Sequence, residues 1–299
     1  MNTQFYLLSR LCCCLVLSLQ ASKSCFSQAD SVLAKLGVSS SFAGGSVYLL
    51  TSENDDGGGN VAALIGPDGI LLVDNMYKVV TPKVKAELKK ISPADIRIVV
   101  NTHFHRDHIE GNTVLSHSSV IIAHENLYKR LSSRPGAQVA GMLPQIVFAD
   151  SMHIYFNGED IRLLHFPNGH TDNDVMVYFT GSAVIHMGDT YFNGMFPAVY
   201  KEGGGDVLQL IANLDKVITM LPENIKIIPG HGPLASKSEL RYYINMLKET
   251  TLIVQKAIRE GKTLDQLQKE KPLIKYDKLG SGGAQTTEQY TAMLYKLLS

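Results

Sequence analysis

Apolar and polar positions alternate in short runs along most of the chain, and most of these runs have the length of a strand. Runs rich in β-branched residues predict strands at residues 46–50, 61–65, 70–73, 96–100, 120–123, 152–156, 161–166, 175–179, 183–187 and 225–228. Helical spacing predicts helices at residues 78–91, 109–115, 125–131, 206–220, 236–259 and 287–298. Residues 30–41 are polar and small, and we expect an extended arm there. Strands and helices alternate in both halves, so the pattern predicts one layered α/β domain.

The first 29 residues differ in kind from the rest of the chain. A positively charged start and a short apolar stretch, Leu11–Leu19, are followed by small residues at the two positions that a signal peptidase reads, Ser27 and Ala29. We therefore expect a signal peptide there, and a periplasmic or secreted mature domain over residues 30–299. A leader that stays uncleaved as a membrane anchor is the alternative, although its apolar run is short for a bilayer span.

Cysteine content and charge narrow the chemistry of the mature chain. All four cysteines lie in the leader, at positions 12, 13, 14 and 25. The mature chain would then hold neither disulfides nor thiolate metal ligands, so only His and carboxylate groups could bind a metal. Without the two basic residues of the leader, 26 basic residues (28 − 2) face 28 acidic ones, a net charge of −2. No basic stripe stands out, and we expect no nucleic-acid partner.

A cluster of ligand-type residues follows the strand predicted at residues 96–100. In extended backbone alternate side chains point the same way, so His103 and His105 can face one point. If a helix begins next, Asp107 and His108 emerge from its first turn close to that point. Four such groups within six residues, at the end of a strand, predict half of a metal centre. A polar loop with surface histidines is the alternative.

Three more candidate ligands stand after later predicted strands, each beside a glycine: His170, Asp189 and His231. Functional groups in α/β proteins concentrate on loops at strand ends, which the sheet holds rigidly. The adjacent glycines permit tight turns that could aim each side chain. Taken singly, each of the three would more often be an ordinary turn residue.

Taken together, the seven residues resemble the metallo-β-lactamase superfamily, whose signature is H-x-H-x-D-H followed by His, by Asp or Cys, and by His. The resemblance covers about residues 44–233 and implies an α/β fold of the αββα sandwich type, with two metals at one edge of the two sheets. Carried over by position, it assigns His103, His105 and His170 to the first metal, Asp107, His108 and His231 to the second, and Asp189 to both. Such ligands with open positions suit two Zn²⁺ ions, although iron or manganese is not excluded.

The resemblance also implies a reaction. Two metals about 3.5–4 Å apart can share a hydroxide and polarise a carbonyl group. This hydroxide would attack an amide, lactam or ester of a small-molecule substrate, while Asp107 orients it and receives its proton. The chain has no G-x-S-x-G element and the mature part no cysteine, so no protein nucleophile is evident. We expect His117, His124, His153, His165 and His186 to be structural, and His186, three residues before Asp189, to be the one that could support a ligand.

The segments around His170 and His231 resemble those of secreted metallo-β-lactamases, which makes β-lactam hydrolysis the leading specific candidate. Two departures count against a dedicated lactamase: Asp189 stands where the commonest subclass has Cys, and Phe192 where it often has Lys. Asp at the former position is usual in the glyoxalase II-like branch, which cleaves thioesters, but the glutathione-binding residues of that branch are not recognisable. An iron-dependent oxidoreductase similar to persulfide dioxygenases and a non-catalytic zinc-binding protein are further alternatives.

Overall fold

The computed structural model of the chain describes residues 30–53, 58–133, 141–282 and 285–299. The signal peptide expected at residues 1–29 lies outside the described residues, so it stays a prediction. No helix among the residues described is both long enough and apolar enough to cross a lipid bilayer.

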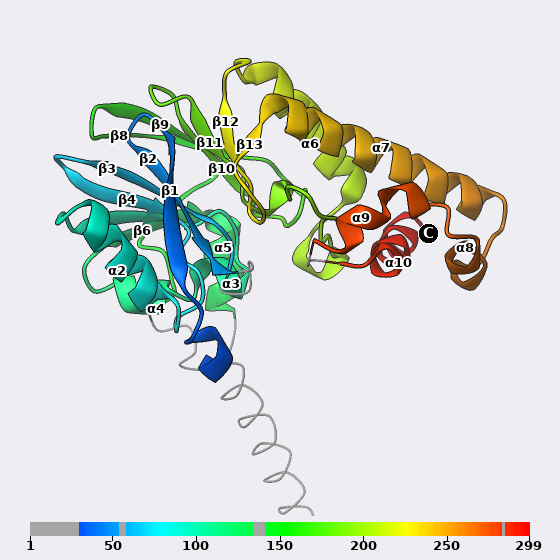
Figure 1. Ribbon diagram of the computed structural model, residues 1–299, viewed down its shortest axis with the longest axis horizontal. Coiled ribbons are helices and arrows are strands. Elements are labelled where there is room, and N and C mark those ends of the chain that lie inside the picture. Colours follow the sequence, from blue (N-terminus) through cyan, green and yellow to red (C-terminus); the bar gives the residue numbers. More distant parts are fainter. Residues whose placement is uncertain (1–29, 54–57, 134–140, 283–284) are drawn as a thin grey trace, which may run out of the picture.

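Two mixed β-sheets form the centre of the fold (Figure 1). The first sheet contains, in spatial order, β1 (Val38–Gly44), β2 (Val47–Ser52), β3 (Val61–Gly66), β4 (Gly69–Val73), β5 (Ile96–Val100), β6 (Val120–His124) and β7 (Ile146–Phe148). The second contains β13 (Ala235–Ser236), β12 (Lys226–Ile228), β11 (Val184–His186), β10 (Val175–Phe179), β9 (Glu159–His165) and β8 (Ser151–Phe156).

Helices cover the outer faces of both sheets. Against the first sheet lie α2 (Thr81–Ile91), α3 (Arg106–Ile109), α4 (Asn112–Leu115) and α5 (Glu125–Ser132). Beside the second lie α6 (Val207–Met220) and α7 (Lys237–Arg259), followed by α8 (Leu264–Glu270), α9 (Asp277–Gly280) and α10 (Thr287–Leu298). Short 3-10 turns complete the chain at η3 (Gly188–Thr190), η4 (Lys201–Gly203) and η5 (Ile274–Tyr276). The four layers confirm the predicted αββα sandwich.

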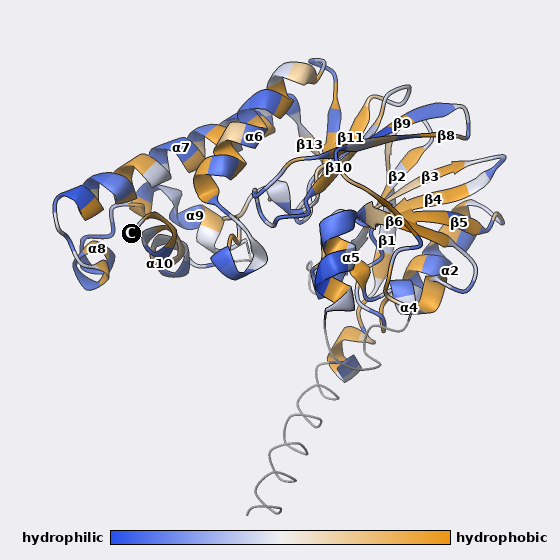
Figure 2. Ribbon diagram, turned by 180° about the vertical axis from the view of Figure 1, so that it is seen from behind, coloured by the Kyte–Doolittle hydropathy of each residue, from blue (hydrophilic) through white to orange (hydrophobic). Residues whose placement is uncertain are grey.

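Apolar side chains explain this layering. All five residues of β4 are buried, which is what a central strand covered on both faces requires. Between the sheets, side chains such as Leu64, Val100 and Phe179 form one continuous cluster. A larger cluster joins the second sheet to α6, α7 and α10. Figure 2 shows the hydrophobic residues concentrated on the strands and on the inward faces of the helices. Burial of apolar surface therefore fixes both sheets against each other and against their helices.

The direction of the strands determines where loops meet. β4, β5 and β6 run parallel to one another, so their carboxyl ends lie at the same edge of the first sheet. In the second sheet β11 and β12 are parallel, and β10 is antiparallel to β11. The loops after β11 and β12 and the loop before β10 therefore share one edge of that sheet. The candidate ligands lie on these loops and on the loop after β5.

Most predicted elements are present, and β5, β10 and α10 begin and end at the predicted residues. The extended arm expected at residues 30–41 is wrong, because residues 30–33 are helical and Val38 begins strand β1, which pairs with β2. As an edge strand with most of its residues partly or fully exposed, β1 lacks the apolar run that marks a strand. The helix expected at residues 109–115 is interrupted, because Gly111 packs closely against Asn75 and Thr81 between α3 and α4. The short elements β7, β13, α8 and α9 were not predicted.

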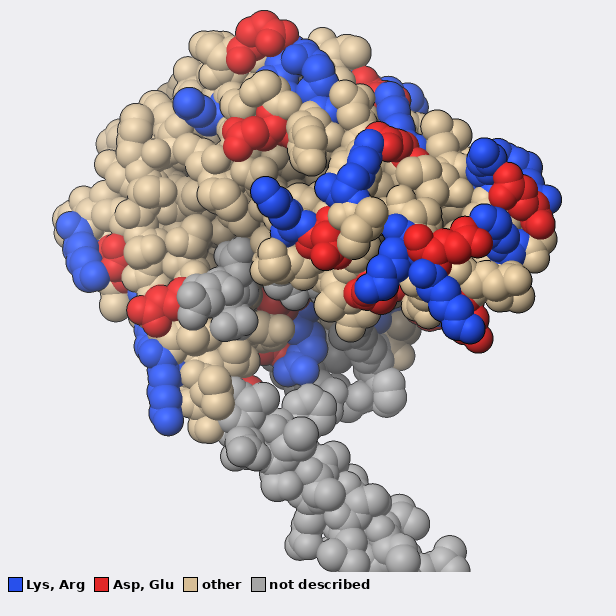
Figure 3. Space-filling model, turned by 45° about the vertical axis from the view of Figure 1, so that its right-hand side comes forward, with Lys and Arg blue, Asp and Glu red and all other residues tan. Residues whose placement is uncertain are grey.

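Basic and acidic side chains alternate over the face that the C-terminal helices present in Figure 3, with no broad area of one sign. Many of these charges pair across or along helices, as Lys248 does with Asp215 and Lys262 with Glu270. Exposed pairs of this kind contribute little to stability, and the packing of α10 depends on its apolar face.

Tyr290 is the side chain through which we expect α10 to be anchored. It is fully buried, its ring stacks on Phe196 at 4.2 Å between centroids, and its hydroxyl lies 2.9 Å from Thr250 Oγ1. Tyr290→Ala should lower the free energy of unfolding by about 3–5 kcal/mol, as for other large buried aromatic residues. Urea unfolding followed by circular dichroism measures this change. The exposed Tyr128 on α5 provides the control, since Tyr128→Ala should shift stability by only about 0.5 kcal/mol. Equal losses in the two variants would contradict the anchoring role.

Candidate metal centre

The seven side chains singled out in the sequence converge at the shared edge of the two sheets. Their ligand atoms fall into two groups, in each of which the atoms lie within 4.8 Å of one another. The first group is His103, His105, His170 and Asp189, and the second is Asp107, His108 and His231. Loops far apart in the sequence thus contribute to each group.

In the first group three imidazoles turn one nitrogen each toward a common point. His105 Nδ1 lies 3.0 Å from His103 Nε2 and 2.9 Å from His170 Nε2. Asp189 Oδ2 lies 3.4 Å from His170 Nε2 and 3.7 Å from His103 Nε2. Three nitrogens and one carboxylate oxygen are a common donor set for zinc.

In the second group Asp107 faces two imidazoles, and Asp189 of the first group lies beside the same two rings. Asp107 Oδ2 lies 3.4 Å from His108 Nε2 and 3.3 Å from His231 Nε2. Asp189 Oδ1 lies 3.1 Å from His108 Nε2 and 3.6 Å from His231 Nε2. Since Oδ2 of the same carboxylate belongs to the first group, Asp189 connects the two groups.

The loop after β5 places four of these residues because of its backbone geometry. It bends at residues 102–104, and His105, whose φ of −69° and ψ of 147° are extended, precedes the first turn of α3. Asp107 and His108 therefore emerge from that turn, as the spacing predicts. The start of the loop is fixed by Asn101, whose Oδ1 accepts a hydrogen bond of 2.8 Å from Asn112 Nδ2 on α4.

Asp74 is a supporting residue that the sequence did not single out. It follows β4, is fully buried and has a left-handed backbone with φ of 63°. Its carboxylate accepts hydrogen bonds from Thr102 Oγ1 and His108 Nδ1, both at 2.7 Å, and from the Thr102 amide at 2.8 Å. Because Thr102 gives its hydroxyl proton to Asp74, Thr102 Oγ1 accepts the proton of His103 Nδ1 at 3.0 Å.

These hydrogen bonds select one tautomer in each imidazole. His103 and His108 hold their protons on Nδ1, and His170 donates its Nδ1 proton to the carbonyl of Ala198. Each of the three rings therefore turns an unprotonated Nε2 toward the centre. Partners of this kind orient metal ligands and raise their basicity. The sequence held one signal for Asp74: it directly follows a wholly apolar strand. In the structure this strand runs parallel to β5, whose loop carries the histidine motif.

Asp174 is a second buried carboxylate that supports the centre. It accepts hydrogen bonds from the amide of His170 at 2.7 Å and from the amide of Thr171 at 2.9 Å. Burial raises the pKa of Asp174 to about 6. The hydrogen bonds oppose this effect because they stabilise the ionised carboxylate. Asp174 thereby fixes the loop that carries His170.

The other histidines make contacts outside the ligand groups. His186 accepts a hydrogen bond from the amide of Gly188 through Nδ1, and its Nε2 lies 3.0 Å from the carbonyl of Asn60. It thus supports the turn that leads to Asp189. His124 and His165 stack on each other at 3.6 Å between centroids, and His153 pairs with Asp160.

Burial and mutual repulsion keep part of the centre unprotonated. Burial, together with the neighbouring histidines, lowers the pKa of His103 well below its usual range and that of His105 to about 3. Burial opposes ionisation of Asp107 and Asp189, but the adjacent His108 and His231 hold the pKa of both carboxyls well below the usual range. Neutral imidazoles and ionised carboxylates are the forms that bind metal ions.

The donor set fits two metal ions. His108 Nε2 and Asp189 Oδ1 are buried, and neither has a hydrogen-bond partner among the described residues. The carboxylates Asp189 and Asp107 raise the pKa of His108 and His231 against the effect of burial, so both groups attract positive charge. A cation in each group would satisfy the unpartnered atoms and compensate the buried carboxylates.

Two aromatic residues that follow Asp189 along the chain are part of the core beside the ligands. Tyr191 is fully buried and Phe192 is 2% exposed. The Phe192 ring stacks on His231 with an interplanar angle of 11° and a centroid distance of 5.4 Å. Phe192 therefore supports the orientation of His231 from within the core.

Comparison with known proteins agrees with this fold and site. The family model "Metallo-beta-lactamase superfamily" matches residues 54–231, and the chain belongs to this superfamily. The predicted family is therefore confirmed, whereas the ligand role of each of the seven residues remains a prediction.

Individual relatives differ in what their names describe. The chain is 24% identical over 253 residues to a linear primary-alkylsulfatase of Pseudomonas sp., covering 67% of this chain and 47% of the relative. It is 27% identical over 207 residues to a probable hydroxyacylglutathione hydrolase of Schizosaccharomyces pombe, and the match covers 69% of this chain and 70% of the relative. The chain thus spans about half of the alkylsulfatase's length.

Among solved structures, a metallo-beta-lactamase from Pontibacter korlensis superposes with a TM-score of 0.60 at 16% identity. The superposition covers 72% of this chain and 99% of that one. At this identity the likeness shows the shared fold.

Asp74 provides a test of the supporting hydrogen bonds. In Asp74→Asn the neutral amide replaces the carboxylate that accepts hydrogen bonds from His108 and Thr102. The tautomer of His108, and through Thr102 that of His103, is then no longer fixed. We expect metal affinity to fall by about 10–100-fold, measured by competition with a chromophoric chelator. Asp215→Asn, at a half-exposed aspartate paired with Lys248, should leave affinity unchanged. Equal affinities in the Asp74 variant and the wild type would exclude this role.

Gly230 provides a test of the close packing around Asp189. A Cβ at position 230 would lie 2.0 Å from Asp189 Oδ1, so the carboxylate that connects the two groups would have to move. We expect Gly230→Ala to lose bound metal, measured by elemental analysis of the purified protein. For Gly203→Ala, where the nearest atom to the new Cβ is 3.6 Å away, metal content should stay at the wild-type level. A wild-type metal content in Gly230→Ala would show that metal binding does not depend on the position of Asp189.

Proposed function

We propose that the chain is an exported, metal-dependent hydrolase that holds two Zn²⁺ ions and opens an amide, lactam or ester bond in a small molecule. The observation that carries this proposal is the position of Asp189 between the two groups: its Oδ2 lies 3.4 Å from His170 of the first group, and its Oδ1 lies 3.1 Å from His108 of the second. A carboxylate shared in this way suits a pair of cations close enough to act on one substrate.

The chain's own residues prepare the centre for hydrolysis. When bound, the two ions would supply Lewis acidity and a water of lowered pKa. The Asp107 side chain is 22% exposed, in contrast to the buried His103, so solvent reaches this carboxylate. Asp107 can accept a hydrogen bond from the attacking water and take its proton. Asp74 and the Ala198 carbonyl keep the imidazoles around it in one orientation.

β-Lactam hydrolysis is the leading specific candidate, supported by the likeness of the segments around His170 and His231 to secreted metallo-β-lactamases. Thioester hydrolysis is the second candidate, supported by Asp189 and by the hydroxyacylglutathione hydrolase of Schizosaccharomyces pombe. The nearly complete burial of Phe192 weighs against a lactam carboxylate being bound at that position.

Export is supported by the leader-like residues 1–29, with their short apolar stretch and small residues before position 30. A cleaved leader would place the mature domain in the periplasm or outside the cell. Determination of the mature amino terminus tests this part of the proposal.

Hydrolysis is tested with one purified preparation whose metal content is measured alongside turnover of nitrocefin, S-lactoylglutathione and an aryl ester. We expect about two zinc ions per chain and metal-dependent turnover of at least one substrate. Asp107→Ala should reduce that turnover by about 10²–10⁴-fold with little change in the circular dichroism spectrum.

Asp215→Ala is the matched control, since Asp215 lies on α6 in a half-exposed pair with Lys248. Its turnover should equal that of the wild type. Undiminished turnover in Asp107→Ala would contradict the role of Asp107 as the acceptor of the water's proton. Bound iron with oxygen consumption would favour the oxidoreductase alternative, and bound zinc without turnover of any substrate would favour the non-catalytic one.

A further inference from the structure

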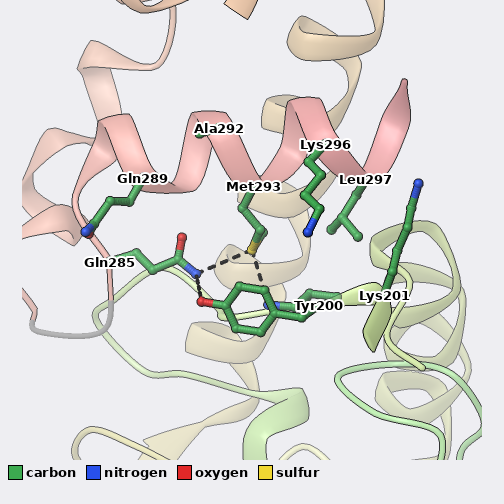
Figure 4. Close-up of a pocket in the computed structure, with 9 residues that line it drawn as sticks. Tyr200, Lys201, Gln285, Gln289, Ala292, Met293, Lys296 and Leu297 are labelled. Atoms are coloured by element: carbon green, nitrogen blue, oxygen red, sulfur yellow. Dashed lines mark hydrogen bonds between the residues drawn. The ribbon is translucent and has the colours of Figure 1, made fainter. Parts of the chain in front are cut away.

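A second recess lies outside the metal centre, between α10 and the segment that leads into η4. Its volume is about 360 Å³, within the range of small-molecule sites. Val199, Ala292, Met293 and Leu297 provide apolar walls, and Figure 4 shows the Tyr200 ring opposite Met293. The recess can therefore hold an aliphatic or other apolar group.

Hydrogen-bond donors with positive charge stand at the same recess. The Tyr200 hydroxyl accepts a hydrogen bond from Gln285 Nε2 at 3.5 Å, at the side of the recess that faces Gln285 (Figure 4). Lys201 forms no ion pair with the described residues. Lys296, whose amino group points toward Tyr200 in Figure 4, pairs with Glu202 at 2.8 Å. Both partners of that pair are more than half exposed, so the pair is weak.

The charge of the lining favours an anion. None of the described residues that line the recess is acidic, whereas two of them are lysines. A lysine donates a charge-assisted hydrogen bond to a carboxylate, and such a bond is stronger where an apolar wall excludes water than on an open surface. An apolar wall with cationic donors matches an amphipathic carboxylate.

The wall of this recess also connects to the first ligand group. The Val199 amide donates to Met293 Sδ at 3.2 Å, and Gln285 Nε2 donates to the Pro197 carbonyl at 3.1 Å. Between these two anchors lies Ala198, whose carbonyl accepts the Nδ1 proton of His170. A ligand that displaces Met293 or Gln285 would therefore move the acceptor that orients His170.

We propose that this recess binds a small amphipathic carboxylate, with an alkyl chain against Met293 and the carboxylate at Lys201 and Lys296, and that its occupancy weakens metal binding through Ala198. The binding itself is independent of the proposed hydrolase function. The coupling rests on His170 being a metal ligand.

Binding is tested by isothermal titration of sodium decanoate, below its micellar concentration, into the purified metal-loaded protein. Decanoate should bind, and decanol should bind about tenfold more weakly because it lacks the charged group. Ala292→Trp should reduce decanoate affinity by about tenfold or more because the indole fills the recess. Ala86→Trp, at an exposed position on α2, should bind decanoate as the wild type does.

The charged contact is tested with Lys201→Gln, which should weaken decanoate binding by about tenfold. Lys216→Gln on the exposed face of α6 should have no effect. Absence of decanoate binding, equal binding in Ala292→Trp and Ala86→Trp, or equal affinity for decanoate and decanol would each overturn the proposed site.

Coupling is tested by zinc affinity, measured by chelator competition with and without saturating decanoate. We expect decanoate to weaken zinc binding by about fivefold or more, and zinc to weaken decanoate binding by the same factor. Unchanged zinc affinity would overturn the coupling. Because neither measurement uses turnover, decanoate binding in a protein that hydrolyses none of the tested substrates would contradict the proposed hydrolase function and leave this site standing.

Discussion

Compensation of buried carboxylate charge is the constraint on which the centre depends. Asp189 is held at the junction of two sheets, almost fully buried, with four imidazole nitrogens within 3.7 Å of its two oxygens. A carboxylate in such surroundings is stable only if positive charge or hydrogen bonds replace its lost hydration. The carboxylates Asp107 and Asp189 raise the pKa of His108 and His231 against the effect of burial, which shows how strongly this pocket favours positive charge. Two cations would supply it without protonating the rings, so the same pocket suits two metals.

The fold meets this constraint because each sheet contributes rigid strand ends. The first sheet brings Asp74 beside the motif after β5, since β4 and β5 run parallel with their ends in register. The second brings Asp189 and His231 together, since β11 and β12 are parallel neighbours. Hydrogen bonds that span loops then fix the imidazole tautomers. The chemistry of the centre thus follows from strand direction as much as from ligand identity.

The sequence predicted the fold and the ligand groups well where the signal was local. An apolar strand followed by closely spaced histidines identifies β5 and its loop without any knowledge of the tertiary structure. Asp74 was missed because a single aspartate after a strand resembles any turn residue, and its role depends on the parallel pairing of β4 with β5. Strand β1 was missed because an exposed edge strand needs no apolar alternation. The recess beside α10 was beyond sequence reasoning, because residues 199–201 and 285–297 meet only through tertiary packing.

The metal centre alone does not determine which substrate a protein of this fold takes. The ligands define what kind of bond can be broken, and the superfamily model that contains them ends at His231. Helices α7 to α10 follow that point, and α10 packs against the segment whose Ala198 carbonyl orients His170. The superposition with the solved β-lactamase shows the shared fold and does not extend to the choice of substrate. Since folds of this kind host many reactions, the residues that distinguish substrates must be sought where the chain departs from its relatives. In this protein, the contact between α10 and residues 197–201 is one place to look, because it connects the recess beside α10 to the carbonyl that orients His170.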